Sequence, residues 1–150
     1  MGNTLKQSKD DLNDNDEHAS KGDVQDYIES LLDEIHVTYY GQYDNDYRYR
    51  NREEPNITTL RSIIEIKGWS KRSNAMTKLK LYSEYAHQGN LKLKICLYGK
   101  PKRRRDMELR YYRELCNNNE IEVFLYETLR RRLNKADSER RKYLIHEYLM

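Results

Sequence analysis

A strictly alternating run near the middle of the chain constrains the fold most. Over residues 91–98 the leucines and Ile95 share one side of an extended backbone, and Lys92 and Lys94 lie on the other. Successive side chains of a β-strand point to opposite faces, so this segment predicts a strand with one buried face and one mixed, outer face. A strand needs partners, and the sequence offers several.

Three further segments carry the same alternation, over 60–67, 78–85 and 120–126. The Gly89-Asn90 pair before the strand at 91–98 suits the tight turn of a β-hairpin. The most economical assembly is an antiparallel sheet of three strands, with 120–126 as a fourth. A helix that runs through Leu133 is the alternative interpretation of that last segment.

Segments of helical period flank this sheet. A helix with an acidic outer side is predicted over Asp23–His36, with Asp23 as its N-cap. Asp106 and Ser138 are candidate caps of later helices. The predicted class is α+β: a small antiparallel sheet of three to four strands, with a helix before it and two to three helices packed at its C-terminal side.

Charge divides the chain into two unlike parts. Residues 1–56 carry 14 acidic and 6 basic side chains, whereas residues 57–150 carry 11 and 22. Residues 1–22 almost lack apolar side chains and are predicted to form a disordered polar tail. We expect 23–56 to be an acidic helix plus a linker rich in Tyr and Arg, and 57–150 to be a basic α+β domain.

The densest basic run, Lys100–Arg105, holds five cations in six residues. A phosphate contact, a nuclear import signal and a solvated turn are all compatible with such a run, and the three interpretations stay open. We predict an anion- or phosphate-binding face centred on it, made up of Lys92, Lys94, Lys100, Lys102, Arg103, Arg104, Arg105, Arg110 and Arg113.

The aromatic composition is unusual, with 14 tyrosines against one Phe and one Trp. Tyrosines alternate with turn formers and arginines over 39–50, a pattern that could stack unpaired bases while guanidinium groups meet phosphate. Packing at the edges of the core is the alternative. The candidate stacking residues are Tyr39, Tyr40, Tyr43, Tyr47 and Tyr49.

Signatures of catalysis and of metal binding are missing from the sequence. There is no glycine-rich phosphate loop, nucleophile elbow or HExxH helix, and the pair of Cys96 and His87 lacks an orienting acid. Two cysteines without CxxC spacing and four scattered histidines predict neither a disulfide framework nor a zinc site. We therefore predict a non-enzymatic protein with no cofactor, no metal and no small-molecule substrate.

The N-terminus offers a candidate lipid anchor. Removal of Met1 would expose Gly2 to myristoylation, although Lys6 stands where the usual pattern has Ser or Thr. Without a signal peptide or a long apolar run, the chain is predicted to be cytoplasmic and peripheral at membranes, with the nucleus as an alternative. A modifiable Gly2, a disordered start and a basic α+β body together resemble the layout of small matrix or accessory proteins of enveloped RNA viruses.

These features lead to one main functional hypothesis and two alternatives. In the main hypothesis the basic face docks on an anionic membrane or on RNA in a ribonucleoprotein, as a viral matrix or accessory protein would, and the chain self-associates. In the first alternative the protein regulates other proteins through its acidic helix or a sheet edge. In the second it binds RNA with little sequence preference.

Overall fold

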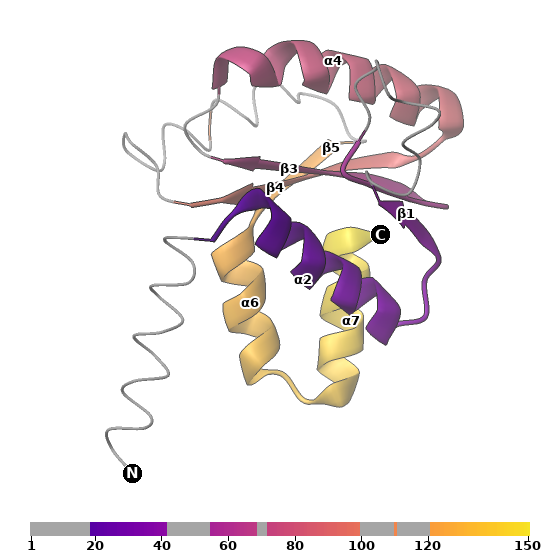
Figure 1. Ribbon diagram of the computed structural model, residues 1–150. Coiled ribbons are helices and arrows are strands. Elements are labelled where there is room, and N and C mark those ends of the chain that lie inside the picture. The colour runs from indigo at the N-terminus through magenta and orange to yellow at the C-terminus, as the bar shows by residue number, and fades with distance from the viewer. Residues whose placement is uncertain (1–18, 42–54, 69–71, 100–109, 111–120) are drawn as a thin grey trace.

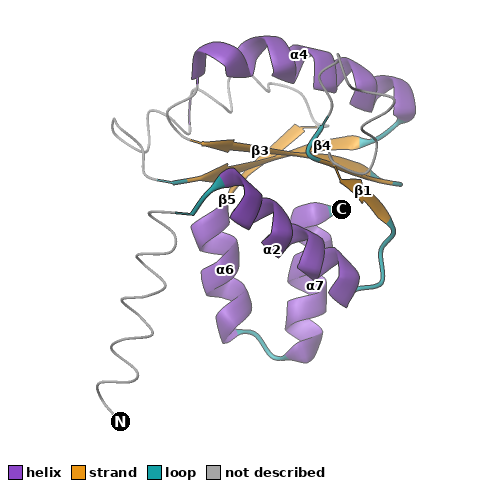
Figure 2. Ribbon diagram, viewed as in Figure 1, coloured by secondary structure: helices purple, strands orange, loops and turns teal. Residues whose placement is uncertain are grey.

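A computed structural model describes residues 19–41, 55–68, 72–99, 110 and 121–150, without the side chains of 72–78. In chain order the elements are α2 (Lys21–Glu34), β1 (Tyr39–Gly41), β2 (Ile57–Thr59), β3 (Ser62–Gly68), α4 (Arg72–Gly89), β4 (Lys92–Tyr98), β5 (Ile121–Leu125), α6 (Tyr126–Lys135) and α7 (Ser138–Leu149). All five described strands belong to one sheet, and of the four described helices α4 covers one face while α2, α6 and α7 cover the other (Figures 1 and 2).

The sheet is mixed, so the prediction of an antiparallel sheet was wrong although the α+β class holds. The strand order is β1-β2-β3-β4-β5, with antiparallel pairing from β1 to β3 and parallel pairing from β3 to β5. Only Leu60 and Arg61 separate β2 from β3, which allows a hairpin. Between β3 and β4 the chain instead passes through the whole of α4, and parallel neighbours need such a crossover.

The predicted strand over 78–85 is part of α4. Leu79, Tyr82 and Ala86 are buried against the sheet, and their spacing is that of one helix face. A short apolar window fits both periods, which explains the error. The Gly-Asn signal marks the end of this helix rather than a hairpin, because Asn90 adopts φ 56° and the Leu91 amide bonds the Ala86 carbonyl at 2.7 Å.

Two predicted helices are confirmed with shifted starts. The N-cap of α2 is Ser20 rather than Asp23, whose carboxylate instead completes a capping box by accepting the Ser20 amide at 3.2 Å. The N-cap of α7 is Asp137, whose side chain accepts the Arg140 amide at 2.8 Å, and Ser138 is the first helical residue.

Both interpretations of the segment after residue 120 hold in part, because β5 runs directly into α6. The predicted linker contains the short strand β1 at its beginning. The helix predicted from Asp106 lies outside the described residues, except for Arg110.

Two apolar clusters lie on opposite faces of the sheet. The cluster under α4 joins Leu79 and Tyr82 to Ile63, Leu93 and Ile95. The larger cluster joins the sheet to all three helices of the other face, through residues that include Ile28, Ile64, Cys96, Leu129 and Ile145. The acidic helix α2 therefore shares a core with α6 and α7.

Candidate functional site

Three charged side chains are buried within the sheet, which is unusual because ionised groups lose their hydration there. Glu65 and Lys67 on β3 are 1% and 6% exposed, and Lys94 on β4 is 1% exposed. Lys94 faces the side of the sheet that carries α7, whereas Glu65 and Lys67 share the α4 side with Ile63. Lys94 therefore has different surroundings from Glu65 and Lys67.

Lys94 has a structural explanation. Its ammonium group donates to a Glu122 carboxylate oxygen on β5 and, at 3.2 Å, to the carbonyl oxygen of Glu147 in the last turn of α7. Ser62 Oγ also donates to the Leu149 carbonyl oxygen at 2.6 Å. The last carbonyls of a helix have no partner within it, so these two side chains complete the C-terminus of α7 from the sheet.

Glu65 and Lys67 sit near the end of β3, two residues apart on the same face. Between them the Ile66 amide is held by Asn56, a residue 1% exposed, whose side-chain oxygen accepts it at 2.7 Å. Glu65 Oε1 is 3.2 Å from the same amide. The chain thus places a buried carboxylate and a buried ammonium two residues apart on one face of β3.

The position of this pair in the sheet is that of many α/β ligand sites. The parallel strands β3, β4 and β5 end on one edge, where α4 and α6 begin. Open α/β sheets commonly bind ligands outside the carboxyl ends of their strands. Lys67 is one residue from that edge, and Gly68 is close to the Tyr98 ring, since a Cβ there would be 3.6 Å from its hydroxyl. After Tyr98 the chain enters the basic run from Lys100.

A second basic feature is the α6–α7 hairpin, which projects away from the sheet (Figure 1). We call its outer end, residues 130–142, the basic tip, because it holds seven cations and two carboxylates. Arg131, Lys135, Arg140 and Lys142 are all exposed there. Guanidinium groups also lie over tyrosine rings: Arg130 is 5.4 Å from the Tyr126 centroid, Arg132 5.6 Å from that of Tyr148 and Arg140 5.0 Å from that of Tyr143.

One cation of the basic tip is committed to holding the helices together. Arg141 forms a bidentate pair with Glu34 on α2, at 2.6 and 3.0 Å. The hydrogen bond to Glu34 raises the pKa of the Arg141 guanidinium. The acidic side of α2 is therefore partly matched by α7 within the molecule.

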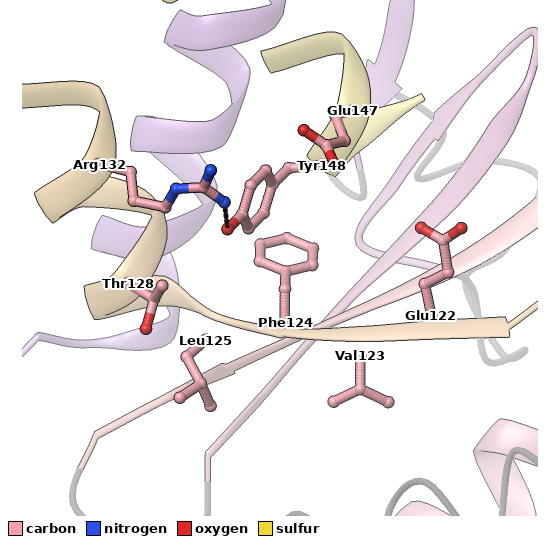
Figure 3. Close-up of a pocket in the computed structure, with 8 residues that line it drawn as sticks. All are labelled: Glu122, Val123, Phe124, Leu125, Thr128, Arg132, Glu147 and Tyr148. Carbon is pink, nitrogen blue, oxygen red and sulfur yellow. Dashed lines mark hydrogen bonds between the residues drawn. The ribbon is translucent and has the colours of Figure 1, made fainter. Parts of the chain in front are cut away.

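A groove of about 410 Å³ follows β5 and is bordered by α6 and α7 (Figure 3). It is lined by Glu122 to Leu125 together with Thr128 and Arg132 of α6 and Glu147 and Tyr148 of α7. The Phe124 and Tyr148 rings meet edge to face at 5.4 Å. Arg132 donates to the Tyr148 hydroxyl at 2.7 Å, and this hydrogen bond raises the pKa of the guanidinium.

The predicted site residues are dispersed. Of the predicted anion-binding residues, Lys94 lies in the interior, Lys92 is exposed 3.8 Å from Glu122, and Arg110 is exposed. Tyr40 is 58% exposed, while Tyr39 is half-buried and donates to Asp33 at 3.4 Å. The remaining predicted residues lie outside the described ranges: Gly2, Tyr43, Tyr47, Tyr49, Lys100, Lys102, Arg103, Arg104, Arg105 and Arg113.

Sequence reasoning missed Glu65 and Lys67. The alternation with Ile64 and Ile66 indicated a solvent-facing side, as in a sheet covered on one face only. A strand between two helical layers has no such side. The available signal was the crossover length between β3 and β4, which implies parallel strands and helices on both faces.

Cys96 is a free, fully buried thiol within the larger cluster. Burial raises the pKa of the thiol well above its ordinary value, because the thiolate would lose its hydration. In a Cys116→Ser variant we expect a maleimide or disulfide reagent at pH 8 to modify Cys96 only as fast as the protein unfolds. Urea should accelerate the reaction at least about 100-fold. Rapid labelling of the folded protein would contradict the burial of Cys96.

The same burial predicts how Cys96 contributes to stability at high pH. The unfolded thiol ionises above about pH 8.5, whereas the folded thiol keeps its proton. The contribution of Cys96 should therefore be complete below that pH and decline as the pH rises above it.

The chain matches no known protein-family model, and no curated protein and no solved structure is significantly similar to it. Within the described residues, no helix has both the length and the apolar character needed to cross a bilayer. The same residues contain no group of three His, Cys, Asp or Glu side chains placed to hold a metal ion.

Proposed function

We propose that this protein binds a phosphate-rich polymer, with RNA or single-stranded DNA as the favoured class, through the basic tip of the α6–α7 hairpin. The observation that carries the proposal is the exposure of Arg131, Lys135, Arg140 and Lys142 on one projecting hairpin. Phosphate contacts release counterions from the polymer, and this term supplies most sequence-independent affinity.

The chemistry of the basic tip favours nucleic acid over a lipid surface. Most of its cations are arginines, whose planar groups pair with phosphate and stack on rings. Tyr143 is 55% exposed with Arg140 over its ring, so this pair offers an aromatic surface to a base beside a cation for phosphate. Docking on an anionic membrane, aided by acylation of Gly2 as in a small viral matrix protein, is the alternative outcome.

Charge reversal at the basic tip tests the proposal. We expect Arg131→Glu with Lys135→Glu to weaken binding of a labelled 20-nucleotide RNA at least about tenfold and to reduce the salt slope by roughly 1 per lost contact. Fluorescence anisotropy between about 50 and 200 mM salt measures both quantities.

The matched control is Arg61→Glu with Lys80→Glu, which changes the net charge equally at exposed sites on the β2–β3 turn and on α4. Equal losses in the two variants would mean that net charge alone drives binding, and the proposal would be wrong. Retention on vesicles of anionic lipid that is lost only in the Arg131 and Lys135 variant, with RNA binding unchanged, would favour the membrane outcome.

A second candidate function is chemistry on a phosphate ester at Glu65 and Lys67. The observation that favours it is the burial of this oppositely charged pair near the carboxyl edge of the parallel strands. Buried charges concentrate at functional sites, although structural ion pairs share this property.

The roles follow from the two groups. Lys67 would bind a non-bridging phosphate oxygen and offset the charge of the transition state. Glu65 would take a proton from water, directly or with a divalent cation bound, as the water oxygen attacks phosphorus and the phosphate–oxygen bond to the leaving group breaks. The leaving oxygen would receive a proton from solvent or from Lys67. Incubation of labelled DNA and RNA with Mg²⁺ or Mn²⁺ tests for this activity.

A further inference from the structure

The outer edge of the sheet at β5 is the surface from which we draw a further inference. β5 pairs with β4 on one side, and within the described part of the chain no strand pairs with its other side. Proteins usually protect such edges with lysine, proline or a bulge, because exposed backbone groups invite another strand. β5 contains neither lysine nor proline, and its one charged residue, Glu122, already pairs with Lys94 and Lys92.

The side chains along this edge are partly covered on both faces. Ile121, Val123 and Leu125 are half-buried on the α4 side of the strand. On the other side Phe124 packs against Tyr148 at the floor of the groove (Figure 3). A strand added at this edge would complete the backbone ladder and cover aliphatic surface at once.

Charges along the groove indicate what kind of strand fits. Arg132 lies towards the Leu125 end of β5, whereas Glu147 and Glu122 lie towards the other end (Figure 3). In a pair of antiparallel β5 strands, the two-fold axis lies between the two strands at their midpoints. It would bring the positive end of one groove opposite the negative end of its copy. Such self-complementarity is what a two-fold symmetric contact requires.

We propose that a second copy of this chain docks on β5, so that the two strands pair antiparallel about Val123 and the two sheets become one continuous sheet. In this arrangement Arg132 of each chain faces Glu147 of the other. Arg132 belongs to the basic tip, but the proposal does not rest on the phosphate-binding function, because the dimer is measured without nucleic acid.

Sedimentation equilibrium of the full chain tests the proposal. We expect the dimer to form within a range of protein concentration that extends to about 100 µM. Val123→Lys should raise the dissociation constant of the dimer at least about tenfold, since a lysine on an edge strand blocks pairing. Leu60→Lys is the matched control, because Leu60 is 88% exposed on the β2–β3 turn and should leave the constant unchanged. A wild-type monomer over this range would overturn the proposal.

Charge exchange gives a test that does not rely on Val123. Arg132→Glu alone should weaken the dimer, and adding Glu147→Arg should restore it, because the pair across the two-fold axis is then reversed. A dimer that ignores Val123→Lys and both charge variants would place the contact elsewhere and would equally overturn the proposal. Circular dichroism of each variant confirms that it is folded.

Discussion

Replacing Lys94 by alanine is expected to lower the free energy of unfolding by about 2–5 kcal/mol, the usual range for truncating a large buried side chain to alanine. The substitution removes the group that joins β4, the Glu122 carboxylate and the end of α7. It also leaves the Glu147 carbonyl without this donor and opens space inside the larger cluster, and both effects add to the loss. Urea unfolding followed by circular dichroism measures this loss of unfolding free energy.

Two further variants separate the causes of that loss. Lys94→Met keeps most of the side-chain volume, so it should cost less than alanine, about 1–3 kcal/mol for the lost hydrogen bonds. Lys92→Ala removes the other lysine near Glu122. The Lys92 side chain is 54% exposed and its ammonium nitrogen is 3.8 Å from Glu122, so its loss should cost no more than about 1 kcal/mol. If Lys94→Ala were as mild as Lys92→Ala, Lys94 would not be holding α7 to the sheet.

The second large effect is a loss of phosphodiester cleavage, expected on substitution of Glu65 or Lys67 on β3. If the protein cleaves a phosphodiester, Glu65→Gln and Lys67→Met should each lower the single-turnover rate at least about 100-fold, since each group stabilises the transition state or moves its proton. Both substitutions nearly preserve side-chain size. RNA binding through the basic tip should persist in both, which shows that the fold is retained.

The matched controls are Glu84→Gln and Lys80→Met, the same chemical changes at exposed positions on α4. These should cleave at the wild-type rate. Wild-type protein that cleaves no DNA or RNA with either metal, or variants of Glu65 and Lys67 that cleave normally, would leave the pair a purely structural feature. Neither result would affect the RNA-binding proposal, because its test uses different residues and no catalysis.

Much of the local structure could be predicted from the sequence. The alternation at 91–98 places β4, because its leucines and Ile95 recur at every second position without exception. The apolar spacing in 23–36 and after Ser138 places α2 and α7. At 78–85 the window is too short to separate the two periods. There the crossover to a parallel strand decided in favour of a helix, and that information lies in contacts between β3 and β4.

The candidate site was much less predictable than the elements that carry it. Lys94 was expected on an outer face beside Lys92, but α7 packs over it and buries it. The contact joins residues 53 positions apart, which no local pattern encodes. The seven cations of the basic tip are part of the positive charge counted after residue 56, whereas the projection of the hairpin from the sheet follows from the packing of α6 and α7.

By itself, the sequence determined the α+β class, the position of β4, the positions of α2 and α7, and the concentration of positive charge after residue 56. Those properties depend on the spacing and kind of neighbouring side chains. Only the tertiary structure decided that the sheet is mixed, that Glu65, Lys67 and Lys94 are buried, and that β5 is the last of the described strands in the sheet order. These depend on which helix covers each face, and burial of a charge is set by groups that the chain brings together from far apart.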